Sequence, residues 1–201
     1  MNVAKDEINE ILGLESMKPK ELRTEIKRKP WDHTFLIEAA LWAERSHDAE
    51  TQCGCVLVKD KTPLSVGYNG FIRDIDDSVL PNLRPHKYPF MIHAEINAIL
   101  NCARQGKSTL GAIAYITTKP CVQCFQFLWQ AGITRIVYSN ISCSHNYNHD
   151  EADDQIQALL LLINPITNVP VGAMRMNVQA QNLVVDFIDK NDVLPKKKDD
   201  K

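Results

Sequence analysis

Two short segments carry residues that could together perform metal-assisted hydrolysis. His93 and Glu95 lie two positions apart in "MIHAEINAIL", and Cys121 and Cys124 form a CxxC pair directly after Pro120. One imidazole and two thiolates give Zn²⁺ three protein ligands and leave its fourth tetrahedral position for water, which is the pattern of a catalytic zinc site. The CxxC pair alone would fit either zinc or redox chemistry, so the histidine decides between them.

Glu95 has a role once zinc is present. A bound zinc lowers the pKa of water from about 15.7 to about 7, so the site would hold a hydroxide nucleophile. A carboxylate two residues from a ligand could accept the proton of that water and deliver it to a ring nitrogen and a leaving amine. The order H-x-E followed by P-C-x-x-C is typical of zinc deaminases. The pattern predicts hydrolytic deamination of an amino-heterocycle; a structural zinc is the alternative, and it gives Glu95 no role.

Two helix starts must bring these residues together. The apolar period and the following glycines predict helices over 93–105 and 122–131, each after an extended segment. Cysteines at i and i+3 lie about one turn apart and can reach one ion, and Pro120 suits a first helical position because it has no N–H. The partial positive charge at both helix starts favours ionised thiols.

The other predicted elements form an α/β domain around these helices. A strand, a helix and a strand within about 25 residues indicate a crossover with parallel pairing of the two strands. The segment 70–90 holds several prolines and polar residues, so we expect a surface loop whose length is typical of a functional one. The remaining predictions are a helix at 33–46, a hairpin of strands 53–59 and 64–68, strands at 112–118 and 133–138, a helix at 155–163 and a last strand at 182–188.

Composition narrows the class of partner. The chain has 201 residues, 44% of them hydrophobic and 24% charged, with a net charge of −2. No apolar run approaches the ~18 residues of a membrane span. The start, "MNVAKDEINEILGLE", lacks the basic and continuously apolar parts of a secretory signal, so we expect a cytoplasmic protein, in the host cytoplasm if the source is viral. Near-neutral charge with basic ends makes nucleic acid an improbable partner and favours a small-molecule substrate.

Beyond the zinc motif, the sequence resembles the deoxycytidylate (dCMP) deaminases of the cytidine deaminase superfamily from about Trp31 to Asp189. The resemblance rests on "ETQCGCVLV", "VGYNG", "DDSVLP", "KYPFMIHAEINAI", "YITTKPCVQC" and "QAGITRIVY", in that order. It implies a three-layer α/β/α fold with a mixed sheet of about five strands. It also implies one catalytic Zn²⁺ per subunit on His93, Cys121 and Cys124, and hydrolysis of dCMP to dUMP with Glu95 as the proton shuttle. Residues 1–30 would then be a charged helical extension, 31–190 the deaminase domain and 191–201 a disordered tail.

The resemblance also implies a set of substrate-binding residues: Thr51, Asn69, Ala94, Arg104 and Tyr147. Asn69 would contact the deoxyribose, and the backbone near Ala94 would read the amino group of cytosine. Arg104 would contact the phosphate. Eleven residues at about 100° each return it to the His93 face of the helix, about 16 Å along, although an exposed helix-end cation is the alternative.

Several features of the sequence depart from the family pattern. Within the family, dCTP activates and dTTP inhibits; Asn69, Gly70 and Arg73 would contact such an effector, but Ile72 replaces a usual proline, which leaves this control open. Ser142 stands where a stacking aromatic is expected, so Tyr147 or His149 would replace it. Lys119 adds a cation that we expect to be solvated. A second, structural zinc on Cys143, His145, His149 or His86 is a weaker hypothesis.

Homo-oligomers, hexamers or else dimers, are expected from the resemblance. Two alternative activities remain open: deamination of dCTP or a 5-substituted dCMP, and deamination of a flipped base in tRNA or single-stranded DNA.

Overall fold

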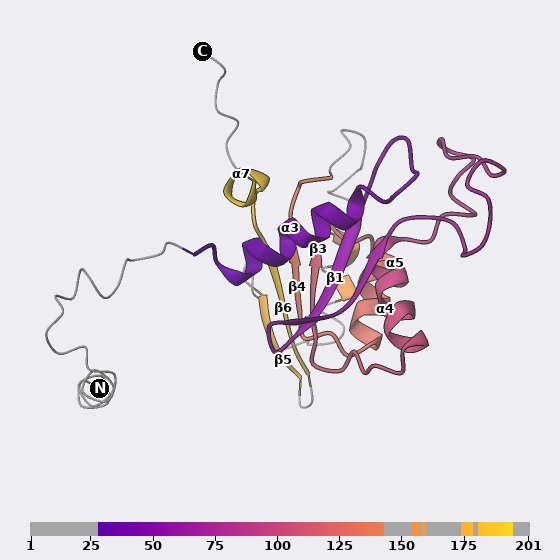
Figure 1. Cartoon of the computed structure of the whole chain (residues 1–201). Helices are drawn as coiled ribbons and strands as arrows, with labels where there is room; N and C mark the ends of the chain where they lie inside the picture. Colours follow the sequence, from indigo (N-terminus) through magenta and orange to yellow (C-terminus); the bar gives the residue numbers. More distant parts are fainter. Residues whose placement is uncertain (1–27, 143–153, 157, 160–173, 179–180, 195–201) are drawn as a thin grey trace, which may run out of the picture.

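A six-stranded mixed sheet organises the protein. The computed structural model describes residues 28–142, 154–156, 158–159, 174–178 and 181–194. The strand order is β2-β1-β3-β4-β6-β5, and Figure 1 shows the strands side by side. The central pairs β3–β4 and β4–β6 are parallel, and the outer pairs β1–β2, β1–β3 and β5–β6 are antiparallel. The bounds are β1 Gly54–Lys59, β2 Thr62–Tyr68, β3 Ile113–Ile116, β4 Arg135–Tyr138, β5 Met174–Val178 and β6 Gln181–Phe187.

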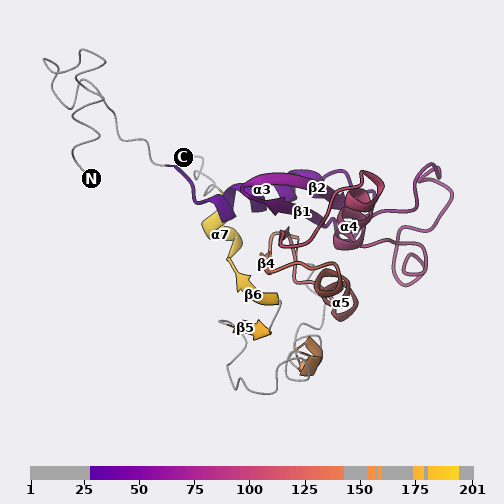
Figure 2. The same ribbon diagram turned by 90° about the horizontal axis from the view of Figure 1, so that it is seen from below.

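Helices cover both faces of the sheet and complete three layers. Successive residues of β1 point to opposite faces: Cys55 and Leu57 pack on one side, and Val56 and Val58 on the other. The first side is covered by α4 (Ala94–Arg104) and α5 (Val122–Gln130), and the second by α3 (Trp31–Ala43). Figure 2 shows α3 and α5 separated by the sheet. The predicted three-layer α/β/α architecture is therefore confirmed.

The two helices that carry the chemical motif begin at the predicted positions. His93 is the N-cap residue of α4 and Cys121 that of α5, and both have extended backbone conformations. The parallel β3–β4 pair with α5 between its strands confirms the predicted crossover. The packing of α4 on β2 is unusually close at Gly67, where an added Cβ would lie 2.5 Å from the backbone nitrogen of Ala98. This contact sets the height of the α4 start above the sheet.

A polar cluster joins the start of α3 to strands β3 and β4. Asp32 accepts hydrogen bonds of 2.9 Å from both terminal nitrogens of Arg135 and one of 2.7 Å from the Tyr115 hydroxyl. Burial alone would raise the pKa of Asp32, but these hydrogen bonds, Arg135's first, outweigh it and hold the pKa below its usual value. The carboxylate is therefore stabilised in its charged form in the folded protein.

Two elements differ from the prediction. Strand β5 was not expected, and it adds a sixth strand at the edge of the predicted sheet of about five. A short helix, α7 (Lys190–Val193), crosses the expected domain boundary at residue 190; its Val193 is fully buried, and the backbone oxygen of Val193 accepts a 3.0 Å hydrogen bond from Lys29. The packed part of the chain thus continues to at least Val193. The expected tail from 195 onward and most of the expected 1–30 extension lie outside the described residues.

The 70–90 segment has no helix or strand, as predicted, and a bridge between Gly70 and Ile92 closes its base. In the described part of the chain, no helix has both the length and the apolar character that crossing a bilayer requires.

Candidate metal and substrate site

The first turns of α4 and α5 bring one imidazole and two thiols together. The Nδ1 atom of His93 lies 3.6 Å from the Cys121 sulfur and 3.3 Å from the Cys124 sulfur. A tetrahedral zinc with bonds of about 2.0 Å to nitrogen and about 2.3 Å to sulfur separates such ligands by about 3.5 Å. The three side chains are therefore placed to hold one zinc ion. Within the described ranges, they are the one group of three metal-ligating side chains that converge on a point.

The thiols are electrostatically prepared for a cation. The hydrogen bond from the Cys124 thiol lowers the pKa of Cys121 to about 4, and the same hydrogen bond together with burial raises the pKa of Cys124. The Cys121 thiol is thus the more readily ionised of the two. Cys121 also accepts a hydrogen bond from the Cys124 backbone N–H at the start of α5. Both sulfurs would bind zinc as thiolates, because thiolates rather than thiols are its ligands.

Glu95 lies beside this cluster and is almost completely buried, with 4% of its surface exposed. Burial raises the pKa of its carboxyl, and the carboxyl also hydrogen-bonds the Cys124 thiol. A carboxyl whose pKa is raised by an apolar site can both take and return a proton near neutral pH. The arrangement provides an acid/base group next to a metal site.

A cavity of about 160 Å³ opens above these residues. His93, Ala94, Glu95 and Cys121 form part of its lining, and further wall residues are Asp48, Thr51, Cys53, Asn69, Arg84, Lys87, Tyr88, Met91, Thr118, Lys119 and Ser142. Its walls come from the 46–53 turn, the end of β2, the 84–91 part of the long loop and the loop after β3. The long loop thus reaches the site.

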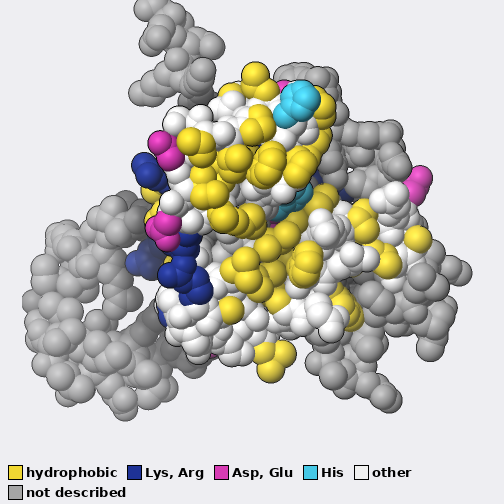
Figure 3. All heavy atoms as spheres, turned by 90° about the vertical axis from the view of Figure 1, so that its right-hand side faces the viewer, with side chains coloured by type: hydrophobic (Ala, Val, Ile, Leu, Met, Phe, Trp, Pro, Cys, Tyr) yellow, Lys and Arg dark blue, Asp and Glu magenta, His cyan; other side chains and the backbone are white. Residues whose placement is uncertain are grey.

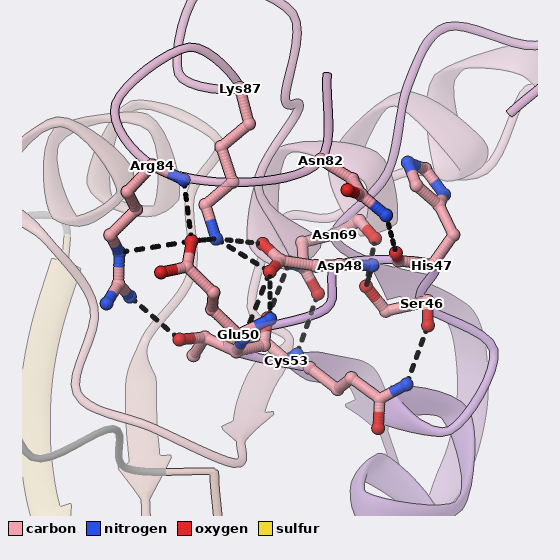
Figure 4. Close-up of polar contacts among 11 residues, drawn as sticks. Ser46, His47, Asp48, Glu50, Cys53, Asn69, Asn82, Arg84 and Lys87 are labelled. Atoms are coloured by element: carbon pink, nitrogen blue, oxygen red, sulfur yellow. Dashed lines mark hydrogen bonds and ion pairs between the residues drawn. The ribbon is translucent and has the colours of Figure 1, made fainter. Parts of the chain in front are cut away.

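Asn69 is held rigidly in the cavity wall. Its amide nitrogen donates to the Asp48 carboxylate at 3.1 Å and to the Thr51 carbonyl at 2.9 Å, and its amide oxygen accepts from the Cys53 N–H at 2.7 Å. Figure 4 shows these contacts. Asp48 is in turn bound by Lys87, whose ammonium lies 2.6 and 2.8 Å from the two carboxylate oxygens.

Most of the residues expected at the substrate meet at this cavity, and some do not. Thr51, Asn69 and Ala94 line it. Arg104 is exposed at the opposite end of α4 and is not a lining residue. Arg104 returns to the His93 face of α4, but the cavity extends only along the first turn of this helix, so the shared face does not bring Arg104 to the cavity. Tyr147, like Cys143, His145 and His149, lies outside the described residues.

Two further expectations can be placed. Gly70 and Arg73 are not among the lining residues; Arg73 hydrogen-bonds Asn101 on α4 instead. Lys119 was expected to be solvated, but it is half-buried in the cavity wall beside Cys121. Ser142 lines the cavity at the place where an aromatic residue was expected. His86 is exposed and joins no metal-ligating group within the described ranges.

Three charged cavity residues were missed at the sequence level: Asp48, Arg84 and Lys87. They lie in turns without helical or strand periodicity, and their association depends on contacts between segments 34 to 39 positions apart. Lys87 does stand at the start of "KYPFMIHAEINAI", six residues before His93. That proximity to a metal ligand was the one available signal.

The fold, the His–Cys–Cys cluster and the adjacent buried glutamate define a zinc-dependent deaminase, a hydrolase acting on a C–N bond. Comparison with known proteins is more specific. Residues 29–140 match the family described as the cytidine and deoxycytidylate deaminase zinc-binding region. The chain belongs to this cytidine and deoxycytidylate deaminase family.

The relatives agree with this assignment. Human deoxycytidylate deaminase is 32% identical over 164 residues, which cover 78% of this chain and 85% of the human one. Deoxycytidylate deaminase of Mycobacterium phage D29 is 32% identical over 126 residues, which cover 56% of this chain and 97% of the phage protein. Among solved structures, the dCMP deaminase of cyanophage S-TIM5 in complex with dCMP and dUMP superimposes with a TM-score of 0.56 at 22% identity, covering 81% of this chain and 99% of that one. The last similarity supports the fold.

Proposed function

We propose that the protein hydrolyses dCMP to dUMP and ammonia. The observation that carries the proposal is the buried Glu95 next to the three-ligand cluster, on the floor of a cavity that also contains Asn69 and three positively charged side chains. The proposal is supported by the deoxycytidylate deaminases to which the chain is similar over most of its length.

His93, Cys121 and Cys124 would hold a zinc ion, which when bound lowers the pKa of a water molecule to about 7. Glu95 takes one proton from the attacking water and passes it to N3 of the cytosine ring while the oxygen bonds to C4. Glu95 then takes the second proton, from the new C4 hydroxyl, and delivers it to the amino group, which leaves as ammonia when the C4–N bond breaks. The backbone at Ala94 contacts the amino group in the cavity floor.

The phosphate of the substrate needs a positive partner at the mouth of the cavity. Arg84 and Lys119 are both half-buried in the cavity wall, and a guanidinium can bind phosphate through two hydrogen bonds. We assign the phosphate contact to these two residues. Arg104, which lies about 16 Å along α4 from His93, remains the competing prediction for the phosphate contact.

The protein acts as a cytoplasmic homo-oligomer, a hexamer or else a dimer, with dCTP and dTTP as effectors near Asn69, Gly70 and Arg73. Support for association comes from the face in Figure 3, where hydrophobic side chains gather. Exposed apolar side chains of the long loop, α4 and α5 are Ile72, Val79, Leu83, Tyr88, Phe90, Leu100 and Phe127. So many exposed apolar residues on adjoining elements are typical of an interaction surface.

Ammonia release from a substrate panel tests the proposed function. Zinc-loaded protein is incubated with dCMP, CMP, dCTP, 5-methyl-dCMP and a cytosine-containing oligonucleotide. We expect dCMP to react fastest. Reaction of the oligonucleotide alone would refute the mononucleotide proposal and favour a nucleic-acid deaminase.

The matched variant is Glu95→Gln, which keeps the size of the side chain and removes its acid/base function. We expect it to bind one zinc per subunit and to lose about 10²- to 10⁴-fold in turnover. Turnover at the wild-type rate would remove Glu95 from the proton transfer.

A further inference from the structure

A buried ionic cluster in the cavity wall has no part in the proton transfers of the proposed deamination. Lys87 has 3% of its side chain exposed, and its ammonium contacts both oxygens of Asp48 and, at 3.0 Å, an oxygen of Glu50. Arg84 joins the cluster through its backbone N–H, which donates to Glu50 at 2.7 Å. Figure 4 shows Lys87 reaching from the long loop to the turn that carries Asp48 and Glu50.

The cluster helps to fix which way the Asn69 amide points, together with the Thr51 carbonyl and the Cys53 N–H. A carboxylate accepts hydrogen bonds and a backbone N–H donates them, so the Asn69 nitrogen must face Asp48 and its oxygen must face Cys53. Both amide protons are used, by Asp48 and by the Thr51 carbonyl. The remaining capacity of Asn69 is one lone pair on its oxygen, which can accept a hydrogen bond from a hydroxyl group.

The deoxyribose of dCMP has a single free hydroxyl, at C3′, because C5′ carries the phosphate and C2′ carries hydrogen. We propose that Lys87 is a positioning residue: through Asp48 it holds Asn69 as an acceptor for this hydroxyl, and so makes the deaminase select nucleotides with a 3′-hydroxyl. The inference rests on the proposed function, since it takes dCMP as the substrate. Lys87 also ties the 84–91 part of the loop, which includes the wall residues Tyr88 and Met91, to the same turn.

Two variants separate positioning from folding. Lys87→Met leaves the buried Asp48 carboxylate without its counter-charge, which is costly and can prevent folding. The double variant Lys87→Met/Asp48→Asn removes both charges. One oxygen of Asp48 accepts hydrogen bonds from the Glu50 and Thr51 N–H groups, and the other accepts from the Asn69 amide nitrogen. In the variant, the asparagine oxygen must take the first position. Its amide nitrogen then faces the Asn69 nitrogen, so that two hydrogen-bond donors oppose each other. The double variant thus replaces one attractive contact of the Asn69 amide with a repulsive one in a neutral, foldable site, while the Thr51 and Cys53 contacts remain.

The experiment compares kcat/KM for dCMP and for 2′,3′-dideoxy-CMP, with the zinc-loaded full chain. We expect the wild type to prefer dCMP, and the double variant to lose about tenfold on dCMP and little on the dideoxy nucleotide, the loss that one hydrogen bond accounts for. Zinc content should stay at one per subunit. Lys107→Met is the matched control, because the ammonium of this exposed lysine hydrogen-bonds the Leu64 carbonyl and lies outside the cavity lining. The substrate preference of this variant should equal that of the wild type.

Equal losses on both substrates in the double variant, with zinc retained, would show that the cluster is merely structural and would overturn the inference. A wild type without preference for the 3′-hydroxyl would overturn it as well, while leaving dCMP deamination intact. A zinc-loaded wild type that does not deaminate dCMP at all would overturn the proposed function, and this inference with it.

Discussion

Replacing Gly67 by alanine should damage the metal site from the far side of α4. An alanine Cβ at this position in β2 would lie 2.5 Å from the backbone nitrogen of Ala98 and closer still to the carbonyl oxygen of Ala94, whereas ordinary contacts begin at 3.4 Å. Neither partner is a flexible side chain, so α4 must retreat by at least about 0.9 Å, the difference between the two distances. Ala94 directly follows His93, so the retreat moves a zinc ligand.

The expected magnitudes follow from this displacement. A zinc site tolerates deviations of about 0.2 Å in ligand distance, so a shift of this size should weaken zinc binding by about 10- to 100-fold. Overpacking of this kind also costs about 1 to 3 kcal/mol of folding free energy. Zinc affinity is measured by competition with a chelator, and stability by thermal unfolding of the zinc-loaded protein.

Gly54→Ala provides the matched control. Its added Cβ would lie 2.8 Å from the backbone nitrogen of Ala43 and closer to the Ala39 carbonyl, so it pushes α3 on the opposite face of the sheet. We expect a similar loss of stability with wild-type zinc affinity. Wild-type zinc affinity in Gly67→Ala would refute the reasoning that β2 sets the position of α4. An equal loss of zinc in both variants would mean that general unfolding, rather than ligand displacement, releases the ion.

Three further outcomes are expected. Arg84→Ala should reduce kcat/KM for dCMP by tenfold or more and leave deoxycytidine unaffected, whereas Arg104→Ala should reduce neither; the reverse result would return the phosphate contact to Arg104. Cys124→Ala should abolish stoichiometric zinc binding, as measured by metal analysis after dialysis, because two protein ligands remain. Asp32→Asn should cost about 1 kcal/mol at pH 7. The folded-state pKa of Asp32 is lowered, so its contribution to stability is present above the unfolded pKa near 3.9 and is lost as the pH falls through the folded pKa. The difference in Tm between wild type and variant should therefore shrink below about pH 4. A difference that stays constant with pH would contradict the role of its charge.

The sequence predicts the parts of this protein whose information is local. The helical period and the following glycines locate α4 and α5, and the spacing of His93, Glu95 and the CxxC pair places the metal site at their starts. Strand β5 was missed although its sequence, MRMNV, alternates apolar and polar residues, and helix α7, at four residues, is too short for a helical period to predict it.

The substrate cavity depends on information that is not local. Arg104 has the correct helical phase, but phase gives no information on how far a cavity extends along a helix. Lys87 and Asp48 are 39 positions apart and lie in irregular segments, so only the folded structure shows that they are bonded to each other. The same holds for Lys119. The sequence around it gave no sign of burial, so a solvated side chain was expected, but in the folded protein it lies in the cavity wall before the start of α5.

The ligands of the metal site come from the caps of two helices that are separated along the chain. His93 precedes Cys121 by 28 positions and Cys124 by 31, and β3 lies between them. A bound ion therefore closes a loop of about thirty residues, as a disulfide would, and restricts the unfolded chain as well as joining the folded one. All three ligands lie at the starts of α4 and α5, so zinc occupancy reports that both helix starts are in place.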